Sequence, residues 1–83
     1  MIGKLVNILM HNTVLIGMVK EYNADGVVLE NAIYFGVAVG YVDRVLVNKF
    51  QALSIINDKD IIDLYIKLIK HRKGVEQWIR NMV

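Results

Sequence analysis

The chain is organised around the stretch VLIGMVKEYNADGVVLENA, residues 14–32. Two runs rich in apolar and β-branched residues flank Asp25-Gly26, and this dipeptide between such runs predicts a β-hairpin. Gly17 interrupts the first run, and a glycine inside a strand either lets the strand bend sharply or lets another backbone approach closely. The stretch therefore predicts a strongly bent hairpin of the kind found in small barrels.

Further strands are predicted on both sides of this hairpin. We expect the strands to cover residues 4–11, 13–22, 27–35, 42–48 and 52–56. A turn is predicted at His11-Asn12, and a loop or bulge between Gly36 and Gly40. Five short strands with tight connections favour a mostly β fold, a small five-stranded SH3-like barrel over residues 1–57.

A helix is predicted after this barrel, because the apolar period changes there from two to about 3.6. Asn57 or Asp58 can cap its N-terminus, and acidic side chains crowd its first turns. Basic side chains follow at Lys67, Lys70, Arg72 and Lys73. The helix dipole favours this order of charges, and a phosphate-binding patch is the alternative explanation of the basic cluster. Residues 58–83 are therefore predicted to form a helical extension of the same domain.

The apolar side chains of this helix cover about 200° of its circumference, which is more than one packing face requires. Part of the helix should lie on its own barrel, and part should contact a neighbouring copy or a protein partner. The residues proposed for this contact are Leu64, Tyr65, Leu68 and Trp78. Trp78 is either an exposed anchor or a packed structural residue. Gly74 is expected to break or kink the helix, with a second helical segment at residues 75–83.

The composition favours self-association and argues against catalysis. Hydrophobic residues make up 55% of the 83 residues, more than so small a domain buries, which favours an oligomer. The chain has no cysteine, which excludes disulfides and thiolate metal sites. Ser54 and Thr13 stand in no catalytic motif, and His11 and His71 have no metal-ligand spacing. We therefore expect no enzyme, no cofactor and no metal.

The charge distribution is balanced over the predicted barrel. Residues 1–57 carry four basic and four acidic side chains, so the net charge of +2 comes from the tail. This charge alone does not indicate a nucleic-acid partner. No stretch reaches the roughly 20 apolar residues of a membrane span, so we expect a cytoplasmic protein without a membrane partner. Binding of the amphipathic tail to a membrane surface is a distant alternative.

The hairpin resembles the first of two sequence motifs of the Sm-like (LSm) family, with spacing closest to its bacterial Hfq branch. Gly17 matches the strand glycine of that motif, Tyr22 the aromatic residue before the turn, and Asn23 the acidic residue of the turn. The apolar triplet that follows falls on residues 27–29 without a gap.

The second family motif falls on residues 48–56. Its short crossing between the last two strands matches residues 49–51, and its apolar positions match Leu53 and Ile56. The resemblance covers residues 4–56. It implies a homo-oligomeric ring of about five to seven copies, in which the fourth strand of one copy pairs with the fifth strand of the next. The interface residues that it implies are Val42, Val45, Val47, Leu53 and Ile55.

Rings of this family bind single-stranded RNA, often rich in uridine or adenine, through two turns at the pore. Stacking and hydrogen bonds to unpaired bases supply the sequence readout. The residues that the resemblance places at these turns are Asn23, Asp25, Lys49, Phe50 and Gln51. Asp25 stands where the family commonly has a stacking residue. Phe50 either supplies that stacking surface from the other turn or fills a gap in the ring wall.

Two hypotheses follow from the sequence. The first is an Sm-like ring that binds single-stranded RNA at its pore, in RNA chaperoning or RNA metabolism. The second is a structural or adaptor ring that presents its C-terminal helices to a protein partner without binding RNA.

Overall fold

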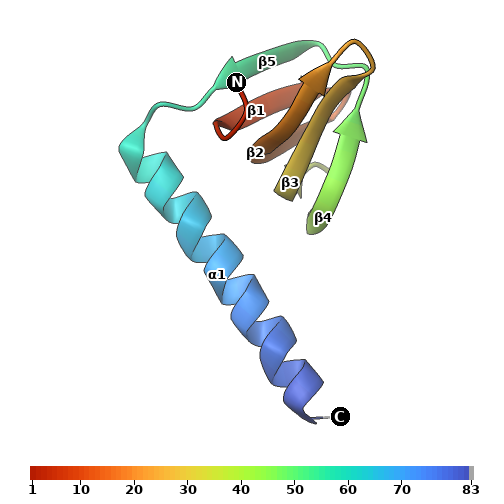
Figure 1. Ribbon diagram of the computed structural model, residues 1–83. Helices are drawn as coiled ribbons and strands as arrows, with labels where there is room; N and C mark the ends of the chain where they lie inside the picture. The colour runs from red at the N-terminus through yellow and green to blue at the C-terminus, as the bar shows by residue number, and fades with distance from the viewer. Residues whose placement is uncertain (83) are drawn as a thin grey trace.

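The computed structural model consists of a curved five-stranded antiparallel sheet followed by one long helix (Figure 1). It describes the backbone of residues 1–82 and the side chains of residues 1–73. The elements are β1 (Leu5–Met10), β2 (Thr13–Asn23), β3 (Gly26–Phe35), β4 (Val39–Val47), β5 (Ala52–Ile55) and α1 (Lys59–Met82). The predicted order of five strands and a C-terminal helix is therefore confirmed.

The strands lie in the order β4-β3-β2-β1-β5, and every neighbouring pair is antiparallel. Three hairpins join β1 through β4, and the chain then crosses to place β5 beside β1. The sheet is curved like a small barrel but is not closed. In the described chain, β4 and β5 are therefore the two free edges of the sheet.

Gly17 allows β2 and β3 to approach closely at a β-bulge. One residue of β2, Gly17, stands opposite two residues of β3, Asn31 and Ala32. Asn31 has a φ of 50°, the left-handed conformation that asparagine tolerates better than most residues. A Cβ atom at Gly17 would lie 3.2 Å from both Cα and Cβ of Ala32. The close backbone approach, one of the two predicted roles of this glycine, is what the structure shows.

The bulge changes which side chains of β3 share a face. Simple alternation along this strand predicts that Ile33 lies on the same face as Val27 and Leu29. Instead Ala32 packs with Val27 and Leu29, and Ile33 belongs to a different cluster. That prediction was wrong because the extra residue at the bulge, Asn31, reverses the alternation beyond it.

Two apolar cores lie on opposite faces of the sheet, because consecutive residues of a strand point to opposite sides. The first core, enclosed by the curved sheet, contains Val6, Ile8, Leu15, Val19, Val27, Leu29, Ala32 and Val47. The second core joins Leu5 and Ile33 to Tyr65 of α1, with half-buried residues such as Ile62 and Leu68 around them. Side chains of the helix therefore pack against one face of the sheet, while the other, concave face encloses the first core.

The helix begins at a cap that the sequence predicted. Oδ1 of Asp58 accepts hydrogen bonds from the backbone N–H groups of Asp60, at 2.9 Å, and Ile61, at 3.4 Å. Of the two predicted caps, the structure uses Asp58 rather than Asn57. No helix in the described chain is both long and apolar enough to cross a membrane.

The helix does not end or break at Gly74. It runs from Lys59 through Gly74 to Met82, and its C-terminal part extends past the sheet (Figure 1). The predicted break was wrong because a glycine inside a helix costs only about 1 kcal/mol relative to alanine, too little to stop a helix that continues on both sides. As a result, Lys73 lies about two and a half turns before the last helical residue. The basic cluster that ends at Lys73 is therefore not at the C-terminal end of the helix dipole.

Candidate functional site

The tip of the β2–β3 hairpin is a tight turn that rests against the end of β4. Oδ1 of Asn23 accepts a hydrogen bond from the backbone N–H of Asp25 at 2.8 Å, which closes the turn. Gly26 has a φ of 138°, and a Cβ atom there would collide with the carbonyl oxygen of Val47 and lie 3.0 Å from Cα of Asn48. Only glycine fits this position, so the hairpin tip is held against Asn48, the residue before Lys49.

The connection between β4 and β5 forms a shallow depression together with the β1–β2 turn. Lys49, Phe50 and Gln51 line this depression with Met10 and His11, and its volume is about 270 Å³. The backbone N–H of Gln51 donates a hydrogen bond to the carbonyl of Leu9 at 2.8 Å, which anchors the connection to β1. Phe50 is 38% exposed. The depression thus combines an aromatic surface, a cation, an imidazole and an amide.

The predicted RNA-binding residues therefore fall into two groups. Lys49, Phe50 and Gln51 lie together, whereas Asn23 and Asp25 are at the hairpin tip and do not line the depression. The oxygen of the Asn23 side chain is already used within the turn. His11, which the sequence indicated only as a turn residue, joins the first group, because the turn after β1 lies beside the start of β5. No spacing in the sequence pointed to this neighbourhood.

The free edges β4 and β5 carry few of the predicted interface side chains in exposed positions. Ile55 on β5 is 41% exposed. Val42, Val45 and Leu53 are half-buried, and Val47 packs in the first core of its own chain. Sequence reasoning missed Leu46, which is 55% exposed on β4. The available signal was the alternation with its neighbours, which places Leu46 on the face opposite the core.

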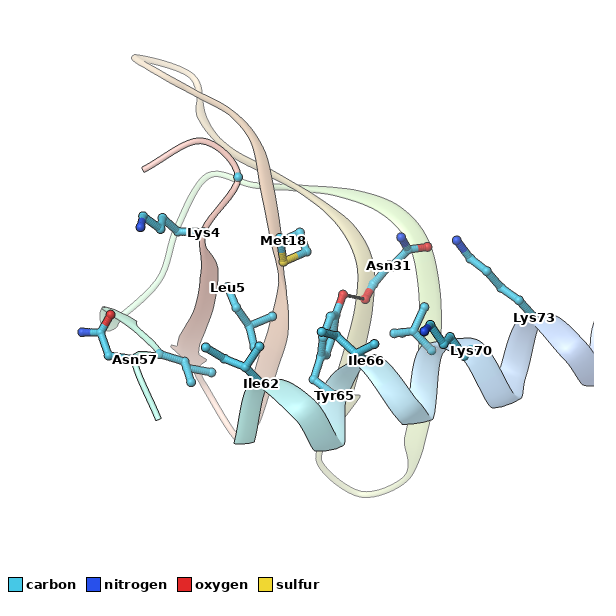
Figure 2. Close-up of a pocket in the computed structure, with 13 residues that line it drawn as sticks. Lys4, Leu5, Met18, Asn31, Asn57, Ile62, Tyr65, Ile66, Lys70 and Lys73 are labelled. Carbon is cyan, nitrogen blue, oxygen red and sulfur yellow. Dashed lines mark hydrogen bonds between the residues drawn. The ribbon is translucent and has the colours of Figure 1, made fainter. Parts of the chain in front are cut away.

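A groove of about 440 Å³ separates α1 from the sheet (Figure 2). It begins at Lys4 and Asn57 and runs along the helix to Lys70 and Lys73, with Tyr65 between the two ends. Its lining is mostly apolar and comes from α1, from β1 and the residues before it, from β2, from Asn31 of β3 and from the segment after β5. No pattern in the sequence indicated this groove, because it forms between elements that are distant along the chain.

Tyr65 links the helix to the bulge of β3 at the side of this groove. Tyr65 is 6% exposed, and its hydroxyl donates a hydrogen bond to the backbone carbonyl of Asn31 at 2.6 Å. Burial raises the pKa of Tyr65 to about 12, and the nearby negative charge of Glu30 adds to this effect. The phenol therefore stays protonated at neutral pH and acts as a donor that holds the helix in place.

The residues predicted to contact a partner through the helix have different environments. Leu64 is 58% exposed and shares the outer side of α1 with Ile61, which is 44% exposed. Tyr65 and Leu68 instead pack against the sheet of their own chain. The side chain of Trp78 lies outside the described residues. Farther along, the guanidinium of Arg72 lies 4.6 Å from the centre of the Tyr41 ring, a cation–π contact that joins α1 to β4.

The described residues contain no group of three side chains that could hold a metal ion. No protein-family model matches the sequence, and no curated protein matches it significantly. Comparison therefore assigns the chain to no family, and its edges, loops and groove carry the functional evidence.

Proposed function

We propose that the protein forms an Sm-like ring of several copies and that this ring binds single-stranded RNA. The observation that carries the proposal is the strand order β4-β3-β2-β1-β5, which leaves β4 and β5 at opposite edges of one sheet. Free edges present unpaired backbone donors and acceptors to other chains. If β4 of one copy pairs with β5 of the next, the contact is head-to-tail, and repeated contacts of this kind close into a ring.

Exposed apolar side chains on the two edges support this pairing. Leu46 on β4 is 55% exposed and Ile55 on β5 is 41% exposed. A strand added at either edge would cover part of these side chains, and each would contribute about 1 kcal/mol, roughly half of the value for burying a whole aliphatic side chain. The high apolar content of the chain supports the same conclusion.

The depression at the β4–β5 connection supports RNA as the ligand of the ring. Phe50 offers a half-exposed ring on which a base can stack, which is worth about 1–3 kcal/mol per base. Lys49 beside it can contact a phosphate, and Gln51 and His11 can bind base edges or sugar. Asp25 repels phosphate, so the RNA backbone should follow Lys49 and avoid the hairpin tip. Repetition around a ring would raise the avidity of each weak site.

The ring is tested by measuring mass in solution. Native mass spectrometry and sedimentation velocity should give a mass about five to seven times that of the 9.5 kDa chain. The double variant Leu46→Lys/Ile55→Lys should dissociate, because it places charges on both edges. Val37→Lys is the matched control, since Val37 is fully exposed in the loop before β4. A native protein that stays monomeric at high micromolar concentration would refute the ring.

RNA binding is tested by fluorescence anisotropy with oligouridine and oligoadenine at two salt concentrations. We expect Phe50→Ala to weaken binding about tenfold without changing the salt dependence, because stacking is lost but no phosphate contact. Lys49→Gln should reduce the salt dependence. Lys20→Gln is the control, because Lys20 pairs with Glu30 at 3.9 Å and does not line the depression. Binding no tighter than roughly 100 μM would reject RNA as the ligand. The ring proposal would then still be tested by the mass measured in solution.

The adaptor ring is the second candidate, and the outer side of α1 favours it. Ile61 and Leu64 are exposed apolar residues on one side of the helix, where no strand of the same chain covers them. In this alternative, Ile61→Ser/Leu64→Ser would abolish binding of a co-purifying protein while the mass of the ring stays unchanged. An RNA-binding ring predicts instead that this variant binds RNA as tightly as the native protein.

A further inference from the structure

The groove between α1 and the sheet combines an apolar interior with basic ends. Its volume of about 440 Å³ lies within the range of small-molecule sites, roughly 300–1,000 Å³. Leu5, Met18, Ile62 and Ile66 supply apolar surface along its length (Figure 2). None of the described residues that line it is acidic. A ligand that fits this lining has an apolar body and a negative charge.

The positive charges at the groove are not used within the described part of the chain. Lys4, Lys70 and Lys73 form no ion pair with any carboxylate there. Lys70 and Lys73 are three residues apart on α1, so their ammonium groups lie on neighbouring parts of the same helix face. They do not interact with the C-terminal end of the helix dipole, because the helix continues to Met82. Two unpaired like charges at one end of an apolar groove favour an anionic group between them.

We infer that this groove binds a single-chain anionic amphiphile in its free, dissolved form, such as a medium-chain fatty acid. The carboxylate lies between Lys70 and Lys73, near the side chain of Asn31, and the alkyl chain extends past Ile66 and Met18 toward Lys4. The aliphatic stem of Lys4 can cover the far end of the chain. This site shares no residue with the RNA-binding depression, so it depends on neither the RNA nor the ring proposal.

The head group is tested by calorimetric titration of the full-length protein with three ligands that share a ten-carbon alkyl chain, each below its micellar concentration or solubility limit. Decanoate should bind, decan-1-ol should bind at least fivefold more weakly, and decyltrimethylammonium should not bind. Acetate should not bind either, because it lacks the apolar chain. Equal affinity for the three amphiphiles, or binding of acetate as tight as that of decanoate, would overturn the inference.

The lysines are tested with a pair of variants that change the charge equally. Lys70→Gln/Lys73→Gln should weaken decanoate binding about tenfold, equivalent to about 1.4 kcal/mol, and leave binding of decanol unchanged. The matched control is Lys59→Gln/Lys67→Gln, which removes two charges from the same helix outside the groove and should leave decanoate binding unchanged. Equal losses in both double variants would overturn the site, because they would reveal only an effect of net charge.

Two other occupants of the groove predict different results. If a second copy of the chain fills the groove, decanoate does not bind, and Lys70→Gln/Lys73→Gln changes the mass measured by sedimentation. If the lysines serve a membrane surface, the protein binds vesicles of phosphatidylcholine and phosphatidylserine but not dissolved decanoate. Either result overturns the inference. Circular dichroism of each variant shows whether it has kept the fold.

Discussion

Replacement of Tyr65 by phenylalanine tests how the helix is attached to the sheet. The substitution keeps the buried ring and removes only the hydroxyl, which donates to the carbonyl of Asn31 at 2.6 Å. That carbonyl belongs to the bulge of β3, so the lost hydrogen bond is one that joins α1 to the irregular part of the sheet. Because Tyr65 is only 6% exposed, its ring should stay in the second core after the substitution.

The magnitude follows from what the carbonyl of Asn31 can bind afterwards. Leaving a buried acceptor without a donor costs about 1–3 kcal/mol. Asn31 also lines the groove beside α1, where water can replace the lost hydroxyl in part. We therefore expect Tyr65→Phe to lower the free energy of unfolding by about 1.5 kcal/mol. For a chain of this length that corresponds to a fall in melting temperature of about 6–12 °C.

Urea denaturation followed by circular dichroism measures this change, at one fixed protein concentration because association shifts apparent stability. The control is Tyr22→Phe, since Tyr22 is 55% exposed and its hydroxyl makes no hydrogen bond in the described chain. The control should change stability by less than about 0.5 kcal/mol. If both variants are equally stable, the hydrogen bond to Asn31 does not hold the helix, and the reasoning is refuted.

The difference in stability between the native protein and Tyr65→Phe should depend on pH. The pKa of Tyr65 is raised from 10.0 to about 12 by burial, with a further contribution from Glu30. The unfolded chain therefore loses this proton first, and the stability from the neutral phenol is complete below pH 10 and is lost as the pH rises toward 12. A full two-unit shift is worth about 2.7 kcal/mol, and screening by water in the groove reduces this to about 1–2 kcal/mol.

The native protein should thus lose about 1–2 kcal/mol relative to Tyr65→Phe between pH 10 and 12. Effects of pH that both proteins share cancel in this comparison. A constant stability difference over that range would contradict the assigned environment of the phenol.

Three further predictions concern the local structure, and each is tested by urea denaturation. Gly26→Ala should lower the free energy of unfolding by roughly 2–4 kcal/mol, because φ is 138° and the added Cβ collides with the backbone of Val47. Gly3→Ala is the control: φ is 80° there but the space around it is open, so this substitution should lower the free energy of unfolding by only about 1 kcal/mol. Equal costs would show that the clash is relieved. Asp58→Ala should lower the free energy of unfolding by about 1 kcal/mol, because the helix loses its cap. Asp58→Asn keeps a capping oxygen and should therefore retain most of this stability. Asn7→Leu should stabilise the protein by about 1 kcal/mol, because Oδ1 of Asn7 is buried without a hydrogen-bond partner in the described chain. A destabilised variant would show that this oxygen does have a partner.

The features that the sequence predicted correctly are set by local interactions. The hairpin around Asp25-Gly26 and the cap at Asp58 each depend on a few neighbouring residues and their backbone conformations. The pairing of β1 through β4 follows from tight turns that the chain makes in succession, whereas the place of β5 beside β1 does not. The role of Gly17 was also predictable as one of two alternatives, because a glycine inside an apolar strand has few other uses.

The features that the sequence did not predict depend on contacts between distant segments. The left-handed conformation of Asn31 is held in a bulge opposite Gly17 and by the hydroxyl of Tyr65, 34 residues away. Periodicity along β3 contains no sign of this tertiary contact. The break predicted at Gly74 was wrong for another reason. A glycine lowers the stability of a helix by only about 1 kcal/mol relative to alanine, which does not by itself end the helix. The groove and the depression each combine residues from separate elements, so no spacing in the sequence describes them.

The arrangement of the elements allows the three proposed surfaces to be tested separately. One face of the sheet encloses the first core and α1 packs against the other face, so the edges β4 and β5 are paired with no other strand in the described chain. No residue of β4 or β5 lines the groove, and the depression lies at the connection between these strands. Ile56, however, lines the groove and directly follows β5, and its backbone N–H donates to the carbonyl of Leu5 at 2.9 Å. A ligand that packs against Ile56 would therefore stabilise the end of the edge strand β5, and decanoate should strengthen ring assembly if the groove and the ring both exist.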